Sequence, residues 1–167
     1  YRTIGGEQQW VKVLFINDAT GIIDLAIHPT NSEIIYAAAW QRVRTAYRRA
    51  YGGPSSGIYK SQDGGDTWQE LVSGLPEAAG RIGITISPVD PDILYALYED
   101  ESNGYLKGIY RSNNNGNTWE TRSLAGITDP PYSYWFGKII ADPIDTNTVY
   151  LTSLDLYKST NGGMIWN

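Results

Sequence analysis

A ten-residue pattern recurs along the chain and constrains the fold more than any other feature. Its three clear copies read YKSQDGGDTW, YRSNNNGNTW and YKSTNGGMIW, and they begin at Tyr59, Tyr110 and Tyr157. A weaker copy, YRTIGGEQQW, begins at Tyr1 and keeps the first tyrosine and the last tryptophan. The chain is therefore built from repeated units of about 50 residues, a period typical of propeller blades when the units consist of strands.

A second pattern follows the same period. It is a proline seven residues before a tyrosine, and it occurs at Pro29, Pro88 and Pro143. Between these landmarks one period divides into four expected strands separated by Gly, Asp and Asn: 81–87, 92–98, 107–112 and 118–123. The sequence predicts an all-β fold, namely a partial β-propeller of four-stranded antiparallel blades covering about three blade periods of a six- or seven-bladed or larger ring.

The periods divide the chain into four parts of one propeller segment, residues 1–167. We expect the end of one blade, a second blade, a third blade and an incomplete fourth blade at 1–16, 21–73, 81–123 and 135–167. Such an arc exposes the apolar flanks of its terminal blades. We expect it to pair with other copies through these edges, or to be the ordered part of a longer propeller chain.

Composition excludes several kinds of site. The chain has no cysteine and a single histidine, His28, which excludes thiolate metal sites and disulfides, so we expect no metal and no cofactor. Eighteen acidic residues against thirteen basic ones give a net charge of −5, which argues against nucleic-acid binding. No apolar run is long enough for direct membrane insertion, and the sequence as given begins with no signal peptide.

The frame S-x-D-x-G-x-T-W, which covers every period, resembles the Asp-box (BNR) repeat of sialidases, sortilin-type receptors and xyloglucanase-type glycosidases. The segments Ile23–Arg44 and Arg81–Leu97 look like those of large bacterial Asp-box proteins of the glycosyl hydrolase or sortilin-like type. The resemblance implies a secreted or cell-envelope protein. It also implies that the box is a structural turn on the face away from the ligand, built here from Ser61, Asp63, Gly65, Thr67, Trp68, Ser112, Asn114, Gly116, Thr118, Trp119, Ser159, Asn161, Gly163 and Trp166.

If the four strands of a blade are lettered A to D, the B–C and D–A connections lie on one face of a propeller, which the resemblance implies is the ligand face. The connection Trp40–Gly57 is basic although the chain as a whole is acidic, because it holds four of the thirteen basic residues. Aromatic and apolar residues there recur at three- and four-residue spacing, which predicts a short helix that ends at Gly52-Gly53-Pro54. The ligand-binding candidates of this connection are Trp40, Arg42, Arg44, Tyr47, Arg48 and Arg49.

Two interpretations of these arginines stay open. They can pair with Glu99, Asp100 and Glu101 in the next blade, or they can hold a carboxylate or phosphate of a ligand or partner. The same face would carry Glu99 and Asp100, and also Tyr132 and Tyr134 after a Pro-Pro pair. The aromatic residues of that last segment form either a packed corner or a platform for a sugar ring or a peptide.

The sequence leaves two possible functions for this propeller segment. The first is an extracellular or envelope scaffold that binds a glycan or a protein through its B–C and D–A loops. The alternative is part of a glycoside hydrolase, xyloglucanase- or sialidase-like, whose catalytic set lies partly outside this segment. Hydrolysis needs two carboxylates across a cleft. The carboxylates on the expected face are Asp18, Glu77, Glu99, Asp100, Glu101 and Asp129, of which Asp100 is a weak catalytic candidate because it follows a B strand.

Overall fold

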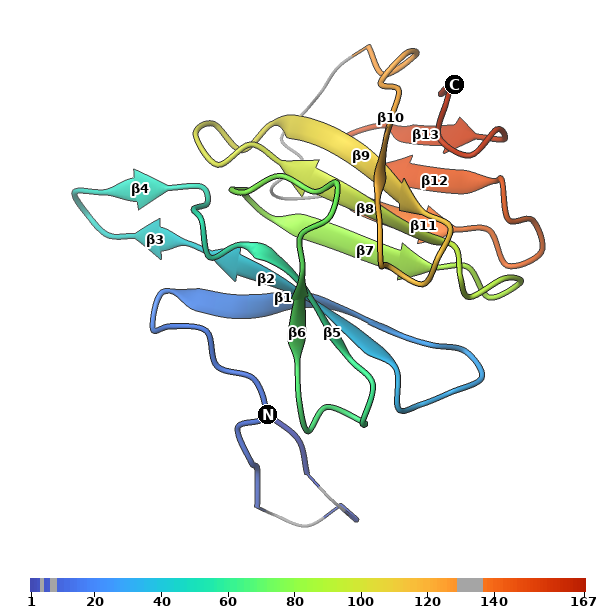
Figure 1. Cartoon of the computed structure of the whole chain (residues 1–167). Helices are drawn as coiled ribbons and strands as arrows, with labels where there is room; N and C mark the ends of the chain where they lie inside the picture. Colours follow the sequence, from blue (N-terminus) through green and yellow to red (C-terminus); the bar gives the residue numbers. More distant parts are fainter. Residues whose placement is uncertain (4, 7–8, 129–136) are drawn as a thin grey trace.

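A computed structural model of the chain describes residues 1–3, 5–6, 9–128 and 137–167. Its main elements are three antiparallel sheets that stand side by side in chain order (Figure 1). The first sheet holds β1 (Thr20–Ile27), β2 (Ile35–Gln41), β5 (Gly57–Ser61) and β6 (Gln69–Leu71). The second holds β7 (Ile82–Ile86), β8 (Leu94–Glu99), β9 (Leu106–Ser112) and β10 (Glu120–Arg122). The third holds β11 (Lys138–Ala141), β12 (Val149–Thr152) and β13 (Leu156–Ser159).

This architecture is a partial β-propeller, as the sequence predicts. The first strands of successive sheets, β1, β7 and β11, lie next to one another on the inner side of the arc. Two side-chain bonds join them there, because Ile84 N–H donates to Asp24 Oδ2 at 3.2 Å and Ala141 N–H donates to Thr85 Oγ1 at 3.2 Å. A hollow of about 390 Å³ opens between these three strands.

The core lies between the sheets. One cluster packs between the first and second sheets around Tyr36, Ile58, Tyr98 and Trp119, and a second packs between the second and third sheets around Tyr95. Strand β8 is buried along its whole length because it has a sheet on each side. Its continuous apolar run, LYALY, is what a strand buried on both faces requires.

The three clear ten-residue copies form one turn geometry. The sixth and seventh positions have positive φ in all three: Gly64 and Gly65, Asn115 and Gly116, Gly162 and Gly163. In the first copy the buried Ser61 Oγ accepts the Gly65 N–H at 2.8 Å, and Asp63 Oδ1 accepts the Thr67 N–H at 2.8 Å. The hydrogen bond from the Thr67 hydroxyl, followed by its backbone N–H and the Ser61 hydroxyl, lowers the pKa of Asp63 to about 2. The side chain of Asp63 is thus committed to its own turn.

The turns that end at Trp119 and Trp166 are tied to the blade before them. Trp119 N–H donates to the carbonyl of Ser73, which follows the D strand of the first sheet, at 3.0 Å, and Trp166 N–H donates to the carbonyl of Ala125 at 2.9 Å. Tyr36 of the first sheet also donates its hydroxyl to the Asn115 carbonyl at 3.0 Å. The turn therefore closes a hairpin and fastens neighbouring blades together.

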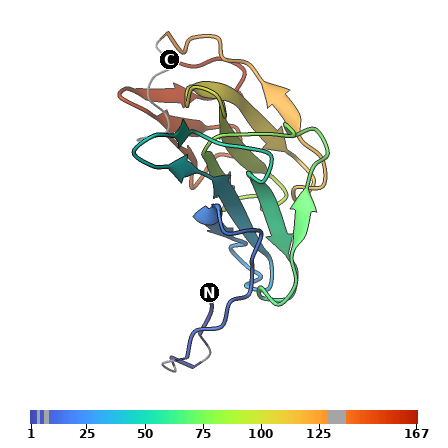
Figure 2. The ribbon, with the colours of Figure 1, turned by 90° about the vertical axis from the view of Figure 1, so that its left-hand side faces the viewer.

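The first part of the chain departs from this pattern. Within residues 1–3, 5–6 and 9–16, an isolated backbone bridge joins Arg2 and Val11, and none of these residues lies in a strand of the three sheets. The expectation that residues 1–16 end a blade stays a prediction. Gly5 occupies the position that Asp63 occupies in the copy beginning at Tyr59, so no side chain there can accept the backbone N–H bonds of the turn. Arg2 instead donates to the carbonyl of Gly64 at 2.7 Å, which holds this segment against the first sheet below the arc (Figure 2).

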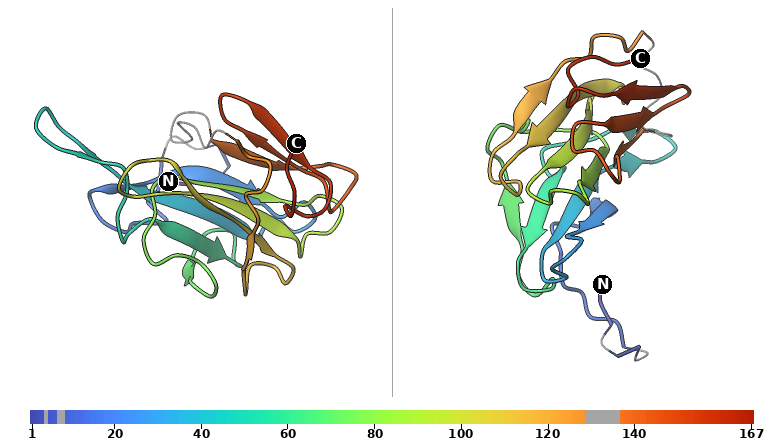
Figure 3. Two further views of the ribbon diagram at one scale, coloured as in Figure 1. Left: turned by 90° about the horizontal axis from the view of Figure 1, so that it is seen from above. Right: turned by 90° about the vertical axis from the view of Figure 1, so that its right-hand side faces the viewer.

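Apolar side chains are exposed on the outer sheets. Leu25 and Ile27 of β1 are 59% and 56% exposed, and Leu156 of β13 is 66% exposed. Strands β1 and β13 belong to the first and third sheets, which lie at opposite ends of the stack of sheets (Figure 3). The expectation that these flanks meet other copies or further blades stays a prediction.

Candidate functional site

The connection Trp40–Gly57 forms a hairpin, so the helix predicted from its spacing is wrong. Strands β3 (Val43–Arg44) and β4 (Arg49–Ala50) pair antiparallel and extend away from the sheets (Figure 1). Thr45 closes the turn, because its hydroxyl accepts the backbone N–H of Arg48 at 3.0 Å and its own N–H donates to the Arg48 carbonyl at 2.8 Å. This local bonding favours a hairpin over a helix in a segment of β-branched and aromatic residues.

The base of this hairpin reaches across to the second sheet. Gly53 N–H donates to the carbonyl of Ala79, in the connection between β6 and β7, at 3.0 Å. The ring of Tyr51 packs on Gly104 in the connection between β8 and β9, where an added Cβ would lie 2.8 Å from the ring. The hairpin is therefore supported by the B–C and D–A connections of the next blade.

The hairpin carries alternating cations and aromatic rings. The guanidinium of Arg42 lies 4.6 Å from the centre of the Trp40 ring, and that of Arg49 lies 5.7 Å from the centre of the Tyr51 ring. Arg49 Nη1 also donates to the Tyr51 hydroxyl at 3.0 Å, which fixes the direction of that guanidinium. Arg44 stands directly opposite Arg49 in the ladder. Tyr47 and Arg48 are exposed at the tip, where Tyr47 is fully exposed.

The acidic candidates of the next blade are held by hydrogen bonds, by an ion pair or by burial within that blade. Asp100 accepts hydrogen bonds from the hydroxyl and backbone N–H of Ser102 and from Asn103 N–H, which lowers the pKa of its carboxyl below the usual value. Glu101 pairs with Lys107 at 2.7 Å. Glu99 ends β8 with 1% of its surface exposed, so its carboxylate is withdrawn from the surface on which the sequence places it. A general acid needs a raised pKa, and Asp100 has the opposite shift.

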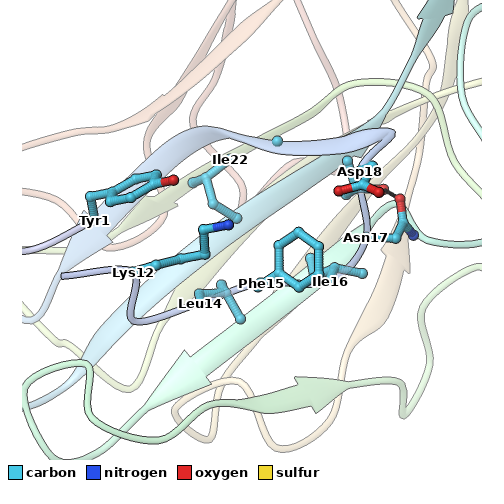
Figure 4. A pocket seen from close by; sticks show the side chains of 10 residues that line it. Tyr1, Lys12, Leu14, Phe15, Ile16, Asn17, Asp18 and Ile22 are labelled. Carbon is cyan, nitrogen blue, oxygen red and sulfur yellow. Dashed lines mark hydrogen bonds between the residues drawn. The ribbon is translucent and has the colours of Figure 1, made fainter.

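Two adjoining hollows open beside the loop Asn17–Gly21. We call the larger one, of about 440 Å³, the Lys12 hollow; it is lined by Tyr1, Lys12, Leu14, Phe15, Ile16, Asn17, Asp18, Thr20, Gly21 and Ile22. In Figure 4 the Lys12 ammonium lies between the rings of Tyr1 and Phe15, 5.8 and 4.5 Å from their centres. Asn17 shapes the loop, because its Oδ1 accepts the N–H of Ala19 at 2.9 Å.

We call the second one, of about 380 Å³, the Trp40 hollow; it is lined by Asp18, Ala19, Thr20, Gly21, Ile22, Ile23, Trp40 and Arg42. Asp18, Thr20, Gly21 and Ile22 border both hollows. Trp40 and Arg42 belong both to this hollow and to the base of the hairpin. The two hollows and the hairpin are thus one continuous surface on the B–C and D–A side.

The structure brings some candidates together and separates others. Trp40, Arg42, Arg44 and Arg49 share the hairpin and the hollow at its base, whereas Asp100 lies in its own turn in the next blade. Tyr132, Tyr134 and Asp129 lie outside the described residues. Lys12 and Phe15 were missed, because the weak first repeat gives no sign that its segment borders a hollow. Among residues 1–3, 5–6, 9–128 and 137–167, no group of three acidic or histidine side chains could hold a metal ion.

Comparison with known proteins places the chain among propellers. It is 25% identical over 99% of its length to a xyloglucanase from Paenibacillus sp., of which it spans 18%. A GH74 xyloglucanase structure from Xanthomonas campestris superposes on 93% of the chain with a TM-score of 0.67 and 15% identity, and the matched part is 23% of that protein. The structure of YCF48 from Cyanidioschyzon merolae superposes on 89% of the chain with a TM-score of 0.54 and 15% identity, and the matched part is 37% of that protein. No protein-family model matches the chain.

These comparisons agree with the partial propeller, and the relatives that match by sequence include glycoside hydrolases. The chain spans about a fifth of the xyloglucanase that it matches along nearly its whole length. Within the described residues, no helix is long and apolar enough to cross a membrane.

Proposed function

We propose that the chain is part of the propeller of a glycoside hydrolase-like extracellular protein, and that its B–C and D–A face binds polysaccharide. One observation carries this proposal: the two adjoining hollows on that face combine aromatic rings, a carboxylate and cations. Sugar sites need such a combination, because rings stack on the C–H faces of a sugar while polar groups bond its hydroxyls. The similarity to xyloglucanases supports the choice of glycan over other ligands.

Asp18 is the carboxylate best placed to bind a sugar in these hollows. It is exposed and borders both hollows, and within the part of the chain that the structure describes its carboxylate is not held by bonds like those of Asp100 or Glu101. An ionised carboxylate accepts two sugar hydroxyls with charge-assisted hydrogen bonds. Lys12 of the Lys12 hollow and Arg42 of the Trp40 hollow can donate to ring and hydroxyl oxygens.

We assign binding, and no catalytic step, to the described residues of this face. Hydrolysis requires a second carboxylate roughly 5–10 Å from the first, across a cleft. Glu99 is buried, Asp100 holds its own turn and Glu101 pairs with Lys107. In this proposal the chain supplies one wall of a polysaccharide site.

The test is binding of the 167-residue chain to a panel of neutral and acidic polysaccharides by affinity electrophoresis, followed by calorimetry with an oligosaccharide of the best ligand. Asp18→Asn removes a charge-assisted hydrogen bond and should weaken neutral oligosaccharide binding about tenfold. Glu33→Gln is the matched control, since it makes the same exchange in an exposed loop on the opposite, A–B face. The proposal fails if no polysaccharide binds, or if Asp18→Asn and Glu33→Gln bind equally well.

A further inference from the structure

We infer that the hairpin β3–β4 makes this face selective for acidic polysaccharides, with sugar carboxylates held by Arg44 and Arg49. The inference rests on the proposed polysaccharide-binding function and names its substrate class. It departs from the xyloglucanase relatives, whose name refers to a single polysaccharide.

The placement of Arg44 and Arg49 is the first observation. They form a directly opposed cross-strand pair, so their side chains leave the same face of the hairpin about 5 Å apart at Cβ. Two guanidinium groups on one face of the ladder form a locally positive surface, and each can donate two parallel hydrogen bonds to a carboxylate. A carboxylate bound between them would be held by two cations.

The second observation is that the neighbouring arginines are oriented by aromatic rings. Arg42 stacks on Trp40, while Arg49 lies over Tyr51 and donates to its hydroxyl. A guanidinium held in a fixed direction loses less entropy when it forms two parallel hydrogen bonds to a carboxylate.

The third observation is continuity with the hollow. Trp40 and Arg42 line the Trp40 hollow, so a glycan chain lying in that hollow continues onto the arginine face of the hairpin. Asp18 also lines this hollow and would repel a carboxylate placed beside it. The acidic groups of the glycan are therefore expected along the hairpin and not next to Asp18.

A carboxylate-bearing glycan fits this surface better than a nucleic acid does. The chain as a whole has a net charge of −5, which opposes a densely charged polymer over a long surface. The hairpin supplies only local positive charge, next to a hollow with a carboxylate in it. This combination suits a polymer with one charge per sugar and uncharged hydroxyls between.

The test compares oligogalacturonate with its fully methyl-esterified form, which keeps the sugars and removes the charge. We expect the acidic form to bind the 167-residue chain at least about tenfold more tightly in low salt, with a smaller difference in high salt. The double variant Arg44→Gln/Arg49→Gln should lose this preference and keep its affinity for the ester. Arg111→Gln is the control, because Arg111 also lies over a ring, that of Tyr95, but contacts Asn147 in an A–B connection.

The double variant must remain folded, and removal of the like-charge pair should leave its Tm equal or slightly higher. Equal binding of both oligogalacturonate forms overturns the inference, as does an acidic preference that survives in the double variant. Binding of oligo-dT as tightly as oligogalacturonate also overturns it, because the hairpin would then hold any polyanion. If both forms bind equally and Asp18→Asn weakens neutral glycans, the inference falls while the proposed function stands.

Discussion

Gly74 is the position at which a single methyl group should separate two blades. It follows Ser73, whose carbonyl accepts the Trp119 N–H of the next blade, and its φ is +82°. A Cβ added there would overlap the Trp119 carbonyl oxygen and lie 3.0 Å from the carbonyl carbon. Because the obstructing atoms are backbone, the connection itself must move and the Ser73 to Trp119 hydrogen bond must stretch.

Two costs add in Gly74→Ala. A left-handed backbone conformation costs an L-residue about 1–2 kcal/mol. Overpacking against atoms that cannot rotate away costs about 1–3 kcal/mol more. For a chain of this size, a total of about 2–5 kcal/mol lowers Tm by roughly 5–15 °C. Thermal unfolding followed by circular dichroism measures the shift.

Gly21→Ala is the matched control, because no atom lies within 4 Å of its added Cβ and its φ is outside the left-handed region. It should leave Tm unchanged or raise it slightly, since alanine reduces the entropy of the unfolded chain. Gly126→Ala should repeat the loss, because its Cβ would overlap the Trp166 carbonyl in the same way. A Tm for Gly74→Ala within about 2 °C of the unaltered chain would refute the argument that this contact fastens the blades.

Four further predictions follow from the described contacts. The Asp63 carboxyl should titrate near pH 2 in an NMR experiment, and the stability that its hydrogen bonds contribute is present above its ordinary pKa of 3.8 and lost as pH falls through about 2; a midpoint near 3.8 would contradict the turn geometry. Ser112→Ala should cost about 1–3 kcal/mol in urea unfolding, because it leaves the buried Gly116 N–H without its acceptor, whereas Ser73→Ala, which keeps the carbonyl, should cost little. Asp100→Asn keeps an acceptor oxygen for its turn and should change neither Tm nor glycan affinity; a loss of binding would return Asp100 to the site. Light scattering should show self-association of the isolated chain, and a monodisperse monomer would refute the role given to the exposed outer sheets.

The sequence predicts the scaffold well because the scaffold repeats. One period places the second sheet at 81–87, 92–98, 107–112 and 118–123, and the structure has strands within two residues of these bounds. The ten-residue copies give the turn and its glycines. Alternation around Pro29, Pro88 and Pro143 gives the strands before each turn.

The parts that do not repeat were harder to predict. Apolar residues at three- and four-residue spacing suggest a helix in Trp40–Gly57, but Thr45 closes a tight turn by its own hydroxyl and a hairpin results. The sequence predicts that Glu99 is a polar loop residue after a strand at 92–98. In the structure β8 extends to Glu99, and this side chain is buried. The first outcome depends on a bond between one side chain and the backbone, and the second on where a strand ends, and the spacing of apolar residues specifies neither.

The three turns also show why charge is needed in one place and not in another. Asn114 and Asn161 accept the same backbone N–H, at 2.9 Å each, that Asp63 accepts at 2.8 Å, and each accepts the serine hydroxyl two residues before it. An amide oxygen therefore accepts the same hydrogen bonds as the carboxylate, so the turn forms in two of the three copies without a charge. On the opposite face, the charges of Asp18, Arg44 and Arg49 occur once and belong to no repeated turn. Charge outside the repeated motif, placed beside a hollow, is the physical reason to look for the ligand on that face.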